Sequence, residues 1–132
     1  SGGSLKGGLL AANGSEVFST VFAGALDDKT LADSRRVLIL HLTDVKAAGQ
    51  RLAMLGSRIL MYNLGRPSPY LVRRGKVEIE LVNRAPGTVV LRALDVNGKT
   101  LGDVPFTEKA GKIVFSADPG VTGAFAYELL RR

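Results

Sequence analysis

Two glutamates on one predicted strand are the nearest approach to a catalytic pair in this sequence. Glu78 and Glu80 alternate with the apolar residues of 76–82, so they share one strand face and lie roughly 7 Å apart by the rise per residue. That separation falls in the range used by inverting glycosidases. A catalytic acid, however, needs a cleft and a perturbed pKa, whereas these carboxylates face solvent. We therefore predict that the pair is not catalytic.

His41 is the only histidine, and it lies inside the most apolar stretch of the chain, residues 36–43. A general base needs a nucleophile and a third group that orients it, and no G-x-S-x-G turn supplies a nucleophilic serine. We expect a packed, hydrogen-bonded histidine. The chain also lacks cysteine for thiolate catalysis or disulfides. The sequence thus predicts a non-catalytic domain without a cofactor.

Two groups of side chains carry oxygen atoms that could bind Ca²⁺. Neither group has the D-x-[DN]-x-[DN]-G spacing of a calcium loop, and Asp and Asn occur in turns because they hydrogen-bond their own backbone. We predict no metal site, with a structural Ca²⁺ in an irregular loop as the alternative. The two groups are Asp27, Asp28 and Asp33, and Asp95, Asn97 and Asp103.

Aromatic residues are few, which restricts where the chain could stack a sugar ring. There is no Trp, and aromatic residues make up 6% of the sequence. The phenylalanines fall in predicted strands, so we expect them in the core, where burial of large apolar side chains stabilises the fold. This expectation covers Phe18, Phe22, Phe115 and Phe125.

Two tyrosines remain as candidates for ligand contact. Tyr62 and Tyr70 flank the Pro- and Gly-rich residues 63–69, with Arg66 and Arg73 nearby. These four side chains form the best candidate carbohydrate-binding patch, because arginines can donate to sugar hydroxyls or uronate carboxylates. The alternative is ordinary interface or loop packing of the tyrosines, which are amphipathic.

Short runs of strand-forming residues alternate with turn signals along the chain, and no βαβ rhythm appears. Residues 77–82 alternate between apolar and charged side chains, as in a strand with one solvated face. Residues 36–43 are apolar enough for a central strand covered on both faces. We predict an all-β fold, an antiparallel β-sandwich of the jelly-roll or Ig-like type with about eight to ten strands. The expected strands are residues 17–23, 36–43, 76–82, 88–96, 99–107, 111–117 and 124–130.

Local signals refine this prediction. Asn97-Gly98 is typical of a type I′ hairpin turn, and Pro105 suggests an edge strand. Residues 44–55 have apolar residues at helical spacing but contain Gly49, so we expect a long loop with one helical turn. Residues 1–8 are Gly- and Ser-rich and predict a flexible linker or a cloning remnant, followed by a single domain over residues 9–132.

The net charge of +6 favours anionic partners. The basic residues are scattered, however, and no RNA-binding aromatic motif accompanies them, which disfavours nucleic acid. No apolar run approaches the ~20 residues that span a bilayer, so we expect no membrane partner.

Several segments of the sequence resemble, in the same order, parts of a module of bacterial glycoside hydrolases. That module is a β-sandwich that follows a (β/α)₈ catalytic barrel. Residues 25–45 resemble a segment of roughly the pattern SLDGKPLAESRRILL that runs into the next strand, although Asp28 replaces the turn glycine. Residues 71–81, 93–105 and 126–129 resemble later parts of the same module.

This resemblance implies a non-catalytic C-terminal accessory module of a carbohydrate-active enzyme. It would act by weak binding to a polysaccharide or oligosaccharide, or by bracing the preceding catalytic domain of the same polypeptide. It also implies an extracellular or periplasmic location. The alternative is a free-standing structural or protein-interaction domain.

Overall fold

The computed structural model describes residues 3–62 and 69–132. The chain divides into two compact units, one made of Ser1–Thr43 and Arg74–Arg132 and the other of Asp44–Arg73. We call the first unit the sandwich and the second the insert, because the insert interrupts the sandwich in the sequence. The prediction of a single domain over residues 9–132 did not anticipate the insert.

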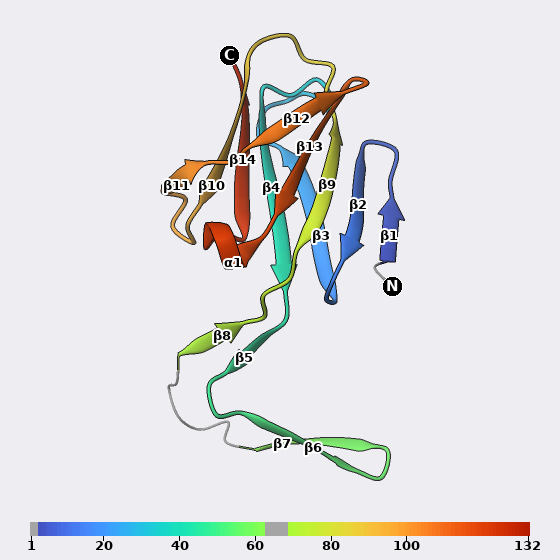
Figure 1. Ribbon diagram of the computed structural model, residues 1–132, viewed down its shortest axis with the longest axis vertical. Coiled ribbons are helices and arrows are strands. Elements are labelled where there is room, and N and C mark those ends of the chain that lie inside the picture. The colour runs from blue at the N-terminus through green and yellow to red at the C-terminus, as the bar shows by residue number, and fades with distance from the viewer. Residues whose placement is uncertain (1–2, 63–68) are drawn as a thin grey trace. The chain divides into compact units, whose positions relative to one another are not determined.

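Two five-stranded antiparallel sheets form the sandwich (Figure 1), which confirms the predicted all-β antiparallel sandwich. Sheet A has the order β1 (Gly3–Lys6), β2 (Leu10–Ser15), β9 (Val77–Val82), β13 (Lys112–Ala117) and β12 (Phe106–Lys109). Sheet B has the order β11 (Thr100–Asp103), β10 (Val89–Leu94), β14 (Ala126–Arg131), β4 (Arg36–Thr43) and β3 (Ser19–Ala25).

The core lies between the inner faces of the two sheets. On β9 the predicted alternation holds, since Val77, Ile79 and Leu81 are fully buried. Sheet B contributes residues such as Ile39, which belongs to the same cluster of buried side chains as the three residues of β9. Each fully buried aliphatic side chain contributes about 1.5–3 kcal/mol by removal of its surface from water.

The chain crosses between the sheets at Pro105. Residues 99–107, predicted as one strand, form β11 and β12, which are edge strands of sheet B and sheet A respectively. Proline cannot donate to a strand ladder, which is consistent with a break at this corner. The edge position suggested by Pro105 is therefore confirmed.

The β10–β11 turn differs from the type I′ turn predicted at Asn97-Gly98. Gly98 has a φ of +80°, but Ala110 is the one residue other than glycine with positive φ in the part of the chain that the structure describes. A type I′ turn needs positive φ at both central residues. The Asp95 carboxylate instead accepts the N–H groups of Asn97 and Lys99, each at 2.8 Å, and this fixes a longer turn.

One short helix, α1 (Pro119–Thr122), precedes β14, and the Asp118 carboxylate accepts the N–H of Gly120 at its start. Within the ranges 3–62 and 69–132, no helix has the length and apolarity needed to cross a bilayer.

The insert consists of two antiparallel ribbons, β5 (Val45–Ala47) with β8 (Tyr70–Val72) and β6 (Arg51–Leu55) with β7 (Arg58–Tyr62). The predicted loop with a helical turn at residues 44–55 is therefore wrong. Gly49 and Gly56 have φ of +80° and +61°, so each takes a left-handed turn conformation that ends a strand.

The N-terminal residues also differ from prediction. Residues 1–8 were expected to be a linker, but Gly3–Lys6 form β1 and pair with β2. The edge of β2 offers backbone donors and acceptors that a Gly- and Ser-rich segment can satisfy without large side chains.

Candidate functional site

Glu78 and Glu80 lie on the outer face of sheet A, as predicted. Glu80 accepts hydrogen bonds from Lys112 Nζ at 2.8 Å and from Asn13 Nδ2 at 2.9 Å. The bond from Lys112 lowers the pKa of Glu80 below its usual value. A glycosidase acid needs the opposite shift, so the shift of Glu80 does not fit that role.

His41 is fully buried on the inner face of β4. The prediction of a packed histidine is confirmed, but the predicted hydrogen bonding is not, because neither ring nitrogen bonds to any of the residues described. Desolvation lowers the pKa of His41, and the negative charge of Asp118 opposes that shift.

This burial predicts a pH-dependent stability. The pKa of His41 in the folded chain lies below the unfolded value of about 6.5, so the unfolded chain binds more protons. The stability that is present above pH 6.5 is therefore lost as the pH falls through the pKa of the folded state. We expect the unfolding temperature to fall between pH 7.5 and 5.5, and to fall less in His41→Leu. Equal slopes in calorimetric scans of the two proteins would contradict this.

Several of the candidate calcium ligands have protein partners. Asp27 accepts the N–H of Arg35 at 2.9 Å, and Asp103 lies 3.6 Å from Arg92. Over residues 3–62 and 69–132, no group of three or more His, Cys, Asp or Glu side chains is arranged to hold a metal ion.

Two of the four phenylalanines expected in the core lie at the surface. Phe115 is buried, but Phe18 and Phe22 are 86% and 54% exposed. For Phe22 the reason is the alternation of β3, in which Val21 packs against the core and its neighbour Phe22 therefore points outward, whereas Phe18 precedes β3. Phe125, the fourth, is half-buried.

The predicted carbohydrate patch is distributed over the insert. Tyr62 ends β7 opposite Arg51, whereas Tyr70 begins β8 opposite Ala47, so the tyrosines belong to different ribbons. They are 50% and 77% exposed. Arg73 follows β8, and Arg66 lies outside the described residues.

The outer face of sheet B carries apolar side chains where a solvated sheet face would be polar. Strand register places Leu40 between Phe22 of β3 and Ala126 of β14, so these side chains form continuous rows. The Phe22 ring lies against Gly24, where a Cβ would come within 3.0 Å of the ring. We call this surface the leucine face, and it comprises Phe22, Leu38, Leu40, Leu42, Val90 and Leu130.

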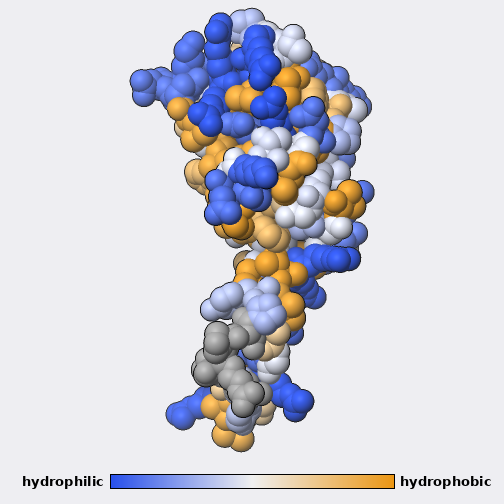
Figure 2. Space-filling model, turned by 90° about the vertical axis from the view of Figure 1, so that its left-hand side faces the viewer, coloured by the Kyte–Doolittle hydropathy of each residue, from blue (hydrophilic) through white to orange (hydrophobic). Residues whose placement is uncertain are grey.

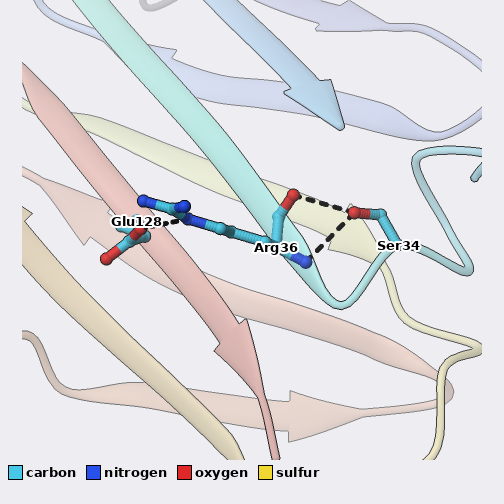
Figure 3. Close-up of polar contacts among 3 residues, drawn as sticks. All are labelled: Ser34, Arg36 and Glu128. Atoms are coloured by element: carbon cyan, nitrogen blue, oxygen red, sulfur yellow. Dashed lines mark hydrogen bonds and ion pairs between the residues drawn. The ribbon is translucent and has the colours of Figure 1, made fainter. Parts of the chain in front are cut away.

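Charges on the leucine face are already paired within it. Glu128 sits opposite Leu38 in the register, and its Oε1 lies 2.7 Å from Arg36 Nε. Figure 3 shows the Arg36 side chain reaching Glu128 on the neighbouring strand. The Ser34 hydroxyl donates to the Arg36 carbonyl at 2.8 Å and accepts the Arg36 N–H at 3.1 Å, as drawn there. A partner could cover this face without leaving these charges unpaired.

The outer face of sheet A is mostly polar, although Ala11 and Val114 also point outward there. Glu78, Glu80 and Asn13 face outward there, together with Lys112 and Ser116 of β13. This contrast shows that the apolar character of the leucine face belongs to one side of the sandwich.

A groove of about 490 Å³ lies along β1, β2 and β3. Its lining combines apolar side chains with serine hydroxyls, and the hydroxyl oxygens of Ser15 and Ser19 lie 3.0 Å apart. The exposed Phe18 lies on its wall. The lining residues are Ser4, Gly7, Leu10, Ala12, Ser15, Val17, Phe18, Ser19 and Val21.

The insert also presents apolar side chains to solvent, and Figure 2 shows hydrophobic residues at its surface beside hydrophilic ones. Strands β6 and β7 pair Leu52 with Met61 and Met54 with Ile59, so these four side chains share one ribbon face. They are 63%, 51%, 70% and 65% exposed, in that order. We call this surface the methionine face.

No protein-family model, curated protein or solved structure matches the chain.

Proposed function

We propose that this chain is a non-catalytic accessory module of a carbohydrate-active enzyme, in which it braces the catalytic domain through the leucine face. The observation that supports this proposal is the apolar outer face of sheet B, set against the polar outer face of sheet A. The resemblance of the sequence to accessory sandwiches of glycoside hydrolases supports the identity of the partner and an extracellular or periplasmic location.

The energetics favour contact with a folded domain. Phe22 and Leu42 are about half exposed. Burial of one whole side chain of this size stabilises by about 1.5–3 kcal/mol, and a partner that covers these two residues removes roughly half of their surface from water. Apolar patches of this kind mark interaction sites on soluble proteins. A flat sheet face can meet another domain over a broad area, whereas a small sugar needs a concave site.

The experiment is binding in trans between the 132-residue chain and the separately produced catalytic domain of the same polypeptide. Leu42→Asp places an unpaired charge in the interface, and we expect it to weaken binding at least tenfold, about 1.4 kcal/mol. Val114→Asp on the outer face of sheet A is the matched control and should leave binding unchanged. Equal affinities for both variants would exclude the leucine face.

Glycan binding is the second candidate, and exposed aromatic rings favour it. Tyr62 and Tyr70 in the insert and Phe18 at the groove of the sandwich present rings to solvent. Chemical-shift titration with neutral and acidic oligosaccharides would separate the two roles, because bracing predicts no shifts at these rings. The alternative of a free-standing interaction domain predicts binding through the leucine face to a protein that is not part of the same polypeptide.

A further inference from the structure

Strand β3 forms one edge of sheet B and lacks the features that protect the other edges of the sandwich. Natural edge strands carry charged residues, proline or a bulge, which discourage pairing with a further strand. Strands β1 and β11 have an irregular register and contain Lys6 and Asp103 respectively. Strand β12 contains Glu108 and Lys109. Residues Ser19–Ala25 of β3 include no charge and no proline, and their pairing with β4 is regular throughout, so this edge is suited to the addition of a strand.

The backbone groups on the free side of β3 follow from its ladder with β4. The Leu26 N–H donates to a carbonyl of β4 at 2.8 Å, and antiparallel strands alternate between bonded and non-bonded pairs. Val21 and Ala23 therefore direct their N–H and C=O groups away from β4. His41, which is opposite Val21, accordingly donates its N–H to Phe125 at 2.8 Å. In the part of the chain that the structure describes, no strand pairs with this side of β3.

Sheet A extends further than sheet B at this edge of the sandwich. Strands β2 and β3 lie on facing sheets, since Leu10 and Val21 pack against the same core and line the same groove. Strand β1 continues sheet A beyond β2, whereas sheet B ends at β3, and Figure 1 shows β1 as the outermost ribbon on that side. The groove of about 490 Å³ between β1, β2 and β3 therefore lies where a further strand of sheet B would run.

An extended peptide matches the chemistry of this groove. An acyl chain or a small apolar molecule would cover the N–H and C=O groups of Val21 and Ala23 without bonding them, which costs free energy. A peptide that adds to the edge of a sheet bonds such groups through its own main chain. The residues that line the groove carry no charge, so the side chains that enter it should be uncharged, because a charge buried there would have no counter-ion.

A second copy of this chain is a poor occupant. If two copies paired through their β3 edges, the second β3 would lie under β1 of the first copy. The β2 strand that faces the second β3 in its own sandwich would then overlap that β1, by the strand order of the two sheets. A single polypeptide segment, which has no covering sheet, avoids this overlap.

We propose that β3 is a receptor edge for an extended segment of another polypeptide, which adds as a further strand of sheet B under β1. Main-chain hydrogen bonds give this contact its affinity, and the groove selects small uncharged side chains at alternate positions of the segment. The receptor edge is distinct from the leucine face, because strand addition uses the side of sheet B rather than its outer surface.

Amide hydrogen exchange with a synthetic peptide tests this proposal. The probe has the sequence of residues 19–25, is capped at both ends and carries flanking lysines for solubility. It is uncharged over the paired residues and lacks the β2 strand that obstructs a second copy. We expect the amides of Val21 and Ala23 to exchange at least about tenfold more slowly when the peptide saturates the chain. The Phe22 amide, which already points to β4, should change little.

Two methylated forms of the peptide are matched controls. Methylation of its amides at the positions of Val21 and Ala23 removes the donors that pair with β3, so it should abolish binding. Methylation at the position of Phe22 alters an amide on the far side of the peptide and should leave binding intact. In the chain itself, Ala23→Pro removes a donor from the free side of β3 at an edge position that tolerates proline, and should weaken binding at least about tenfold. Leu42→Asp on the leucine face should leave peptide binding unchanged.

Equal affinities of the two methylated peptides would overturn the proposal, and this comparison does not depend on the folding of any variant. The absence of saturation at about 1 mM peptide would also overturn it. So would protection of Val21 and Ala23 that appears in the chain alone as its concentration rises, which indicates a second copy. Chemical-shift changes at Leu10 and Phe18 without amide protection would exclude strand pairing as well, because they show occupancy of the groove alone.

Discussion

Replacing Tyr127 by alanine is expected to lower the free energy of unfolding by about 3–5 kcal/mol. Tyr127 is fully buried on β14, and its ring meets that of Phe115 from the opposite sheet at a centroid distance of 5.3 Å and an interplanar angle of 59°. Truncation removes this tilted aromatic contact and leaves a cavity between the sheets. Urea unfolding monitored by circular dichroism would measure the loss.

Tyr127→Phe is the matched control. The hydroxyl lies 3.2 Å from the Thr122 hydroxyl and 3.4 Å from the Ala124 carbonyl oxygen, so its removal should cost only about 1 kcal/mol. A loss of less than 1 kcal/mol for the alanine variant would show that the two sheets do not pack around this ring.

The second large effect is expected at Arg131, a buried cation at the end of β14. Its Nε donates to Asn83 Oδ1 at 2.7 Å, and its Nη1 donates to the Ser34 carbonyl. Burial lowers the pKa of Arg131, and the charges of Asp27 and Asp33 oppose that shift. Arg131→Leu leaves two acceptors without their charged donor, so we expect a loss of about 2–4 kcal/mol.

Arg132→Leu provides the comparison. Arg132 is exposed and bonds Thr88 through its backbone, so its substitution should change stability by no more than about 0.5 kcal/mol. Equal losses for Arg131→Leu and Arg132→Leu in the same urea titration would contradict the structural role of the Arg131 side chain.

Most strands of the sandwich were predictable because they bury an alternating or continuous apolar set. Strands β1 and β2 were not predicted, and β11 is exposed along its whole length. The run at residues 36–43 matches β4, and its continuous apolar character predicted coverage on both faces. The structure covers the inner face of β4, but Leu42 on its outer face is 47% exposed, so the predicted coverage of both faces is not confirmed. The sequence did not show that Phe22 would lie outside, because the facing of β3 is decided by the packing of Val21 rather than by side-chain size.

The insert was not predictable from local pattern. Apolar residues from Val45 to Leu55 fit both a helical and an alternating spacing, and short apolar segments leave this ambiguity open. The structure resolves this ambiguity, because the chain turns at Gly56 and residues Arg58–Tyr62 pair with Arg51–Leu55 as strands. Where Tyr62 and Tyr70 lie depends on this pairing, so their separation onto two ribbons could not be anticipated.

Isothermal titration of the 132-residue chain into the proposed partner, the catalytic domain of the same polypeptide, tests the proposed bracing role most directly. Burial of the leucine face predicts saturable one-to-one binding with a negative heat-capacity change, the marker of apolar surface removed from water. Titrations at several temperatures would measure that change. The absence of binding at the highest soluble concentrations, or binding with no change in heat capacity, would contradict the account.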